Sequence, residues 1–218
     1  QMGASIRGAG TSTITIKGVD SLNGAYTEVV PDYIEAGTYV LAGALIGDNL
    51  TIENLIPSHI ESLTSKLKDM GVELEIKNNS IKVSSKKTYK PVNIRTAVYP
   101  GFPTDLQQPF SVLLTRCDGT SKIKETIWEN RFMHIPYLEK MGANAEINGN
   151  EVKITGITDL KGTDVVATDL RAGAAMILAG LIAEGKTEVT SIEHVLRGYE
   201  NIVEKLVNVG AKVKIEEI

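Results

Sequence analysis

An internal repeat constrains the fold of this chain more than any single motif does. A three-residue segment recurs four times, beginning at Met2, Met70, Met141 and Val209, at intervals of about 70 residues. Its first residue is Met or Val, its second is Gly, and its third is Ala or Val. A chain made of such copies buries its core by packing each unit against the next. The copies can therefore be compared with one another to obtain the order of elements in one unit.

Each later copy of this segment closes a helical pattern. Leu63, Leu67 and Met70 have the spacing of one helix face, and Gly71 is suited to the left-handed conformation that ends a helix. Further upstream in a unit, a second helical pattern such as 169–185 leads into a β-branched stretch such as 186–192. The unit therefore reads βαβαββ, which predicts an α/β fold.

The ends of the chain depart from this unit. Residues 71–85 and 142–156 predict hairpins with Asn-rich or Asn-Gly turns, whereas the third copy predicts only one strand, over 210–218. We expect the last repeat to lack its final strand. Residues 1–19 match the end of a repeat, so we expect them to be the remnant of a first domain and 20–218 to form a second. The missing first domain of the same polypeptide would supply the missing strand.

Composition excludes several classes of protein. The 218 residues are 42% hydrophobic, enough for a substantial core, and the net charge of −4 comes without a basic run interleaved with aromatics, which argues against nucleic-acid binding. The longest apolar stretch, 172–183, is far shorter than a membrane span. A single cysteine fits a reducing compartment. We expect a cytoplasmic protein without a membrane partner.

Some local motifs are misleading. Residues 180–187 fit the phosphate-loop pattern, but a helix leads into them and a strand leaves, the reverse of a working phosphate loop. His59, His134 and His194 have no partner at metal-ligand spacing, so no metal site is expected. Cys117 is expected to be a small buried or half-buried residue.

Polar pairs at predicted helix starts are the stronger functional signals. Thr104 and Asp105 open one helix, and Thr168 and Asp169 open the corresponding helix of the next unit. Both pairs are natural N-caps. Ordinary capping remains an alternative to a functional role, more so for Asp169 than for Asp105.

Three arginines lie near turns or helix starts, at Arg131, Arg171 and Arg197. Guanidinium groups bind carboxylate and phosphate through paired charge-assisted hydrogen bonds. The three together would suit a ligand that carries both groups. Periodicity alone does not separate this interpretation from a solvated surface.

Five blocks together resemble the UDP-N-acetylglucosamine enolpyruvyl transferase family, and the resemblance covers essentially the whole chain. It implies two domains, each an inside-out α/β barrel of three βαβαββ repeats with pseudo-threefold symmetry. It also implies an active site in the cleft between them, and an N-terminal segment that crosses over to complete the second domain. The blocks are 31–38, 100–105, 129–134, 167–173 and 197–200.

The resemblance implies transfer of the enolpyruvyl group of phosphoenolpyruvate to the 3-hydroxyl of UDP-N-acetylglucosamine, with release of phosphate and no cofactor. Asp105 resembles the proposed general base, a role that suits a carboxylate within reach of a hydroxyl. Arg131 and Arg171 resemble ligands of the phosphoenolpyruvate carboxylate. Arg197 resembles a ligand of its phosphate. In the family this reaction is the first committed step of peptidoglycan synthesis, and so of bacterial cell-wall biogenesis, cell shape and division.

The remaining site residues come from the same resemblance. Asp169 is expected to orient the neighbouring arginines. Thr104, Ile127 and Trp128 resemble walls of the nucleotide-sugar pocket, Ile127 through its backbone, and Glu129 of the same block is a further candidate substrate contact.

Two departures from the family pattern are local. Tyr33 stands where an arginine is usual, and Leu196 where an aspartate is usual, which puts the electrostatics around Glu35 and Arg197 in doubt. The lysine and the cysteine loop of the family's first domain would precede Gln1. We therefore expect this chain to be inactive alone.

Three other interpretations fit the sequence less well. The sister enzyme acting on shikimate 3-phosphate shares the fold, but its motifs differ and its phosphorylated acceptor would call for more basic residues. RNA 3′-terminal phosphate cyclases have similar repeats, but an acidic chain argues against RNA. A non-catalytic domain would not need Asp105 together with three arginines.

Overall fold

The computed structural model describes residues 1–216 and divides the chain into two compact units, Gln1–Val30 and a second that begins at Pro31. The first unit contains an antiparallel hairpin of β1 (Ser5–Arg7) and β2 (Thr15–Lys17). The assignment of residues 1–19 to the end of a repeat stays a prediction. The domain boundary after residue 19 stays a prediction.

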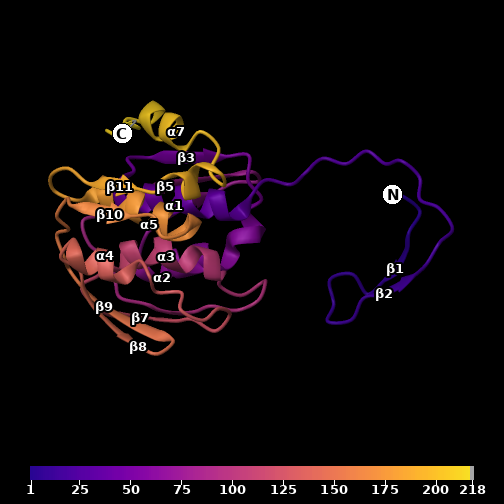
Figure 1. The fold of residues 1–218 in the computed structure, drawn as a ribbon, viewed down its shortest axis with the longest axis horizontal. Helices are drawn as coiled ribbons and strands as arrows, with labels where there is room; N and C mark the ends of the chain where they lie inside the picture. Colours follow the sequence, from indigo (N-terminus) through magenta and orange to yellow (C-terminus); the bar gives the residue numbers. More distant parts are fainter. Residues whose placement is uncertain (217–218) are drawn as a thin grey trace. The chain divides into compact units, whose positions relative to one another are not determined.

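Three helices form the centre of the second unit: α1 (Tyr33–Ile46), α3 (Thr104–Leu114) and α5 (Leu170–Ile182). They pack against one another, and Figure 1 shows them side by side in the interior. Most of their residues are buried. This suits α1 and α5, because a helix that is apolar on nearly all sides is stable only when it is enclosed, whereas α3 also buries the polar residues Gln107, Gln108 and Ser111. Within residues 1–216, every helix is too short or too polar to cross a bilayer.

Three sheets surround these helices. Figure 1 shows β3 and β5 on one side of the helices, and β7, β8 and β9 on the opposite side. Among the strands named within residues 1–216, the β6–β7 and β10–β11 pairs are parallel and the other pairs are antiparallel. In sheet order, the strands are β3 (Leu50–Glu53), β5 (Ser80–Ser84) and β4 (Glu73–Ile76); β6 (Asn93–Arg95), β7 (Gly119–Lys124), β9 (Glu151–Gly156) and β8 (Asn144–Asn148); and β10 (Asp164–Val166) and β11 (Glu188–Thr190).

The predicted βαβαββ order is complete in the middle unit, where α4 (Ile135–Lys140) stands between β7 and β8. The preceding unit has the 3-10 helix η1 (Pro57–Ile60) and α2 (Glu61–Met70) before its hairpin, but no strand over 18–32. The third unit ends with α6 (Glu193–Leu196) and α7 (Ile202–Asn208).

The strand predicted after Gly210 is wrong for residues 211–216, which have no regular structure. The rest of that predicted strand, 217–218, lies outside the described residues. A strand is stabilised by hydrogen bonds to a neighbouring strand, and within residues 1–216 none pairs with this segment. The segment 211–216 therefore has no neighbouring strand within residues 1–216 that would stabilise it as a strand.

Several local predictions are confirmed. Gly71 ends α2 with a φ of 86°, and the buried face of α2 contains Leu63, Leu67 and Met70. Both predicted hairpins form. Cys117 is fully buried. Around residues 180–187, α5 leads in and β11 follows, as expected for a segment that is not a phosphate loop.

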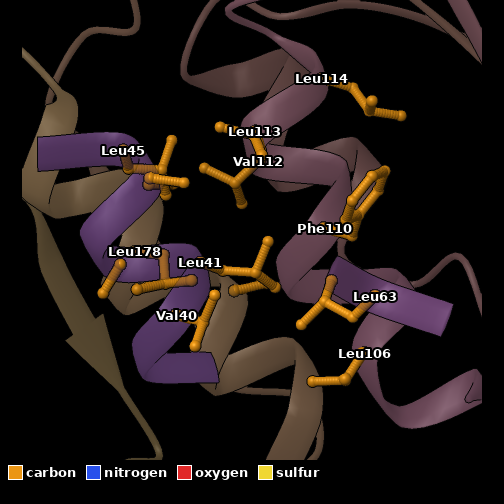
Figure 2. Close-up of a cluster of buried hydrophobic side chains, with 14 of the residues drawn as sticks. Val40, Leu41, Leu45, Leu63, Leu106, Phe110, Val112, Leu113, Leu114 and Leu178 are labelled. Carbon is orange, nitrogen blue, oxygen red and sulfur yellow. The ribbon is translucent and has the colours of Figure 1, made fainter. Parts of the chain in front are cut away.

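The core lies where the three helices meet. Figure 2 shows Leu41 of α1 directed toward the helix that carries Leu106 and Phe110, with Val40 of α1 and Leu178 of α5 close by. All five side chains are at most 3% exposed. Close packing of this kind leaves little room for added atoms.

Gly43 lets α1 approach β5 closely. A Cβ atom at this position would lie 2.2 Å from Cγ1 of Val83, a fully buried side chain. Alanine normally stabilises a helix relative to glycine, so space and helix propensity oppose each other here. We expect the overlap to dominate and Gly43→Ala to lower the free energy of unfolding by about 1–3 kcal/mol, measured by urea denaturation.

The double variant Gly43→Ala/Val83→Ala is the control for this explanation. Removing the Val83 methyl groups relieves the overlap, so the double variant should be more stable than the sum of the two single effects predicts. Additive losses would contradict a steric origin.

Candidate functional site

A hollow of about 340 Å³ opens beside the start of α3. The predicted residues Thr104 and Asp105 line it, together with Ile127 and Trp128 from the segment after β7. Trp128 is 61% exposed, so a ligand in the hollow could cover it. The remaining lining residues are Tyr33, His59, Ala97, Val98, Tyr99, Gly101 and Pro103.

Asp105 is held between two of the predicted arginines. Its Oδ1 accepts a hydrogen bond from Nη2 of Arg131 at 2.6 Å, and its Oδ2 accepts one from Nε of Arg171 at 3.1 Å. The Asp105 side chain is 33% exposed and the two arginines less. One carboxylate and two guanidinium groups together have a net positive charge. In addition, Nε of Arg131 is buried without a hydrogen-bond partner in the described structure. This arrangement can attract a further anion.

A chain of hydrogen bonds fixes Arg171 from the other side. Its Nη1 donates to the Tyr199 hydroxyl at 3.1 Å, and this hydroxyl lies 2.9 Å from that of Thr38. Thr38 donates its own proton to the Ile34 carbonyl, so Tyr199 is the donor to Thr38. The guanidinium also lies over the Tyr199 ring, 5.5 Å from its centre. The Tyr199 side chain thus connects the second turn of α1 with the first turn of α5.

These contacts shift the ionisation of the groups involved. Burial opposes the charge of Arg171, but the Tyr199 hydroxyl and the Asp105 carboxylate outweigh it, and the pKa of Arg171 is raised. Burial raises the pKa of Tyr199, although Arg171 acts in the opposite direction. The pKa of Tyr33 is also raised, by burial and then by Asp105 and Asp32. Arg171 is therefore a permanent cation, and both phenols are neutral at physiological pH.

The two predicted caps behave differently. Asp169 is the N-cap of α5, and its Oδ1 accepts hydrogen bonds from the backbone N–H groups of Arg171 and Ala172. The capping prediction is wrong for Thr104 and Asp105, which lie inside the first turn of α3 after Pro103. Their side chains instead bond to Glu125 and to the arginines, because tertiary partners compete successfully with the local backbone.

Glu125, which the sequence interpretation missed, lies behind the wall of the hollow and is 2% exposed. Its carboxylate accepts hydrogen bonds from Thr104 and from the backbone of Ile127 and Trp128. The alternation of buried residues Ser121 and Ile123 along β7 places Glu125 on the inner face. That alternation is the signal that could have identified it.

Two of the predicted residues are not brought into this cluster. Arg197 follows α6 and is exposed, and within residues 1–216 its side chain makes no hydrogen bond or ion pair. Glu129 is likewise exposed. Their predicted contacts with substrate stay predictions.

His134, at the end of the block that contains Arg131, is fully buried. Its Nε2 lies 2.9 Å from the Ser111 hydroxyl, which donates its proton to the Gln108 carbonyl, so Nε2 is the donor and Nδ1 carries no proton. Burial lowers the pKa of His134 to about 3, Arg131 acts in the same direction, and Asp169 opposes them. The imidazole is therefore neutral.

Among residues 1–216 there is no group of three histidine, cysteine, aspartate or glutamate side chains that could hold a metal ion. The chemistry available is that of a partly exposed carboxylate, two cations and neutral hydrogen-bonding groups.

The α/β fold is that of the enolpyruvyl transferases. The chain belongs to the EPSP synthase family, because the model described as EPSP synthase (3-phosphoshikimate 1-carboxyvinyltransferase) matches residues 1–206.

Among curated proteins, the chain is 51% identical over 217 residues to UDP-N-acetylglucosamine 1-carboxyvinyltransferase 2 of Bacillus cereus (strain ATCC 14579), covering 100% of this chain and 51% of that protein. It is 52% identical over 213 residues to UDP-N-acetylglucosamine 1-carboxyvinyltransferase of Halothermothrix orenii, covering 98% of this chain and 51% of that protein. The chain spans about half the length of these curated relatives.

Solved structures of similar fold include an enolpyruvyl transferase and an EPSP synthase. The enolpyruvyl transferase NikO from Streptomyces tendae superposes with a TM-score of 0.88 at 31% identity, over 98% of this chain and 51% of that one. EPSP synthase from Acinetobacter baumannii superposes with a TM-score of 0.78 at 17% identity, over 99% of this chain and 53% of that one, and supports the fold alone.

The neutral state of His134 gives a prediction for the pH dependence of stability. The unfolded chain binds a proton at His134 below about pH 6.5, whereas the folded chain does so only near pH 3. Stability should therefore fall as the pH is lowered through this window, by up to about 1.4 kcal/mol per pH unit from this group. Urea denaturation between pH 4.5 and 6.5 should show a shallower pH dependence for His134→Gln than for the unchanged chain.

The same replacement at His194, a partly exposed residue of α6, is the matched control. An equal change of slope in both variants would contradict the assignment to His134.

Proposed function

We propose that the full-length polypeptide transfers the enolpyruvyl group of phosphoenolpyruvate to the 3-hydroxyl of UDP-N-acetylglucosamine and releases phosphate. The single observation that carries this proposal is the Asp105 carboxylate held by Arg131 and Arg171 beside the hollow. Relatives that are 51–52% identical to this chain are named for UDP-N-acetylglucosamine, which supports this nucleotide sugar as the acceptor. The place of the reaction is then the first committed step of peptidoglycan synthesis, in the cytoplasm, and it serves cell-wall biogenesis, cell shape and division.

The proposed roles follow the charges of the site. The acceptor hydroxyl adds to C2 of phosphoenolpyruvate as its proton passes to Asp105, while the electron pair of the C=C bond takes up a proton at C3 to give a tetrahedral intermediate. Phosphate then leaves C2 as a proton is lost from C3, which restores the double bond of the enolpyruvyl group. Arg131 and Arg171 bind the substrate carboxylate, with Asp169 positioning the backbone of Arg171. Arg197 binds the phosphate and stabilises its charge as it leaves.

A substrate carboxylate at these arginines would compete with Asp105 for the same donors. Its arrival would weaken the two ion pairs of Asp105 and leave that carboxylate free to accept a proton. Carboxylate binding and activation of the base are thus coupled in this proposal. Thr104, Ile127, Trp128 and Glu129 surround the acceptor.

For the fold, we propose that 20–218 form one inside-out barrel of three βαβαββ repeats with pseudo-threefold symmetry, the C-terminal half of the enzyme. A second hollow of about 430 Å³ lies among α1, β3 and α7, with largely apolar walls. We propose that the first domain of the same polypeptide supplies a strand there. The half-length match to the curated relatives supports a partner of this kind.

The shikimate enzyme is the weaker candidate. The family model bears its description, but the structural match to an EPSP synthase has only 17% identity. Relatives named for the nucleotide sugar match at 51–52%.

The first experiment measures phosphate release from phosphoenolpyruvate by the full-length protein, with UDP-N-acetylglucosamine or shikimate 3-phosphate as acceptor. Release should require the nucleotide sugar, and Asp105→Asn should lower kcat by at least about 100-fold because the general base is lost. Asp69→Asn, an exposed aspartate on α2, should leave kcat unchanged. Release with the shikimate compound only, or with neither acceptor, would refute the proposed function.

The isolated chain provides a separate prediction. Because the proposed cleft needs both domains, residues 1–218 alone should release no measurable phosphate under conditions in which the full-length protein is active. Activity of the isolated chain would mean that this half contains the whole site.

A further inference from the structure

Glu125 is a buried acid without a cationic partner in the described part of the chain. Its Oε1 accepts hydrogen bonds from the Thr96 hydroxyl at 2.7 Å and from the backbone N–H groups of Ile127 at 2.7 Å and Trp128 at 3.2 Å. Its Oε2 accepts one from the Thr104 hydroxyl at 2.8 Å. Burying a carboxylate is costly unless its oxygens are well satisfied, and four neutral donors satisfy them here.

The contact with Thr104 determines what that residue offers to the hollow. A threonine hydroxyl has one proton, and an ionised carboxylate can only accept. Because the proton points to Glu125, only the lone pairs of the Thr104 oxygen remain for a ligand. Thr104 therefore lines the hollow as an acceptor.

The same carboxylate affects the next wall residue. The N–H of Ile127 is directed to Glu125, so a backbone contact of Ile127 with a ligand would use its carbonyl oxygen. Asp105 adds a carboxylate on the same wall. Three acceptors, one from each of Thr104, Ile127 and Asp105, select for a ligand surface that carries hydrogen-bond donors.

We propose that Glu125 is a positioning residue that sets the hydrogen-bond polarity of this wall, so that Thr104 recognises a hydroxyl or amide N–H of the sugar acceptor. The inference rests on the proposed function and concerns the recognition of the acceptor only. It assigns no role to Glu125 toward phosphoenolpyruvate.

A purely structural role for Glu125 would be to hold the segment after β7 against the start of α3. The variant Glu125→Gln separates the two roles because it keeps the size of the side chain. Its amide oxygen can still accept from Thr96, Ile127 and Trp128. Its amide nitrogen would face Thr104, which would then accept, and the hydroxyl proton of Thr104 would turn toward the hollow.

The test is a double-mutant cycle in the full-length protein, with kcat/KM for UDP-N-acetylglucosamine measured at saturating phosphoenolpyruvate. Glu125→Gln should lower this value about tenfold, the loss expected for one hydrogen bond of inverted polarity. The KM for phosphoenolpyruvate should stay within about twofold. In a Thr104→Val background, which has no hydroxyl to orient, Glu125→Gln should cost less than about twofold.

The matched control is Glu151→Gln, the same chemical change on β9, which should leave both substrates unaffected. An equal effect of Glu125→Gln in both backgrounds, or an equal effect on both substrates, would overturn the inference while the unchanged enzyme remained active. An inactive unchanged enzyme would instead refute the proposed function.

If Glu125→Gln does not fold, as judged by its melting temperature, two variants of Thr104 test the inference directly. Thr104→Ser keeps the hydroxyl and should retain most of the acceptor kcat/KM, whereas Thr104→Val should lose about tenfold. Equal values for these two variants would overturn it.

Discussion

The packing of α1, α3 and α5 against one another determines where this protein can do chemistry. The contacts of Arg171 with Asp105 and, through Tyr199, with Thr38 join the first turns of α3 and α5 to the second turn of α1, and Tyr33 at the start of α1 lines the same hollow as Asp105. Helix starts carry partial positive charge and unpaired N–H groups. Bringing three of them together creates a region suited to anions, which Arg131 strengthens. The hydrophobic core and the candidate site thus depend on the same helix packing.

Only part of this arrangement could be predicted from the sequence. The cap at Asp169 and the left-handed Gly71 depend on neighbours in the chain, so local patterns were sufficient. The contacts of Thr104 depend on Glu125, which is 21 residues away, so the sequence could suggest Thr104 as a cap or as a pocket wall but not its hydrogen bond to Glu125. The strand expected after Gly210 failed for a related reason, since alternation alone does not supply a partner strand.

The exposed position of Arg197 is another feature that the sequence did not predict. The resemblance implied that Arg197 binds the phosphate of phosphoenolpyruvate, yet no element of the described chain holds its side chain near Asp105. A guanidinium on a short segment after α6 has no buried contacts to orient it, unlike Arg171 with Tyr199. In the proposed enzyme, its orientation would depend on substrate or on the first domain, so this half is only partly preorganised.

The carboxylates of Asp105 and Glu125 lie in different surroundings, and in the proposed enzyme they have different roles within the same site. Asp105 is a third exposed and pairs with two cations that a substrate anion can also engage, so its partners are exchangeable. Glu125 is almost fully buried, and its four donors belong to the wall itself. Proton acceptance needs a carboxylate that can change partners during the reaction. Selectivity needs one that cannot, because a fixed acceptor keeps the hydroxyl of Thr104 in a single orientation.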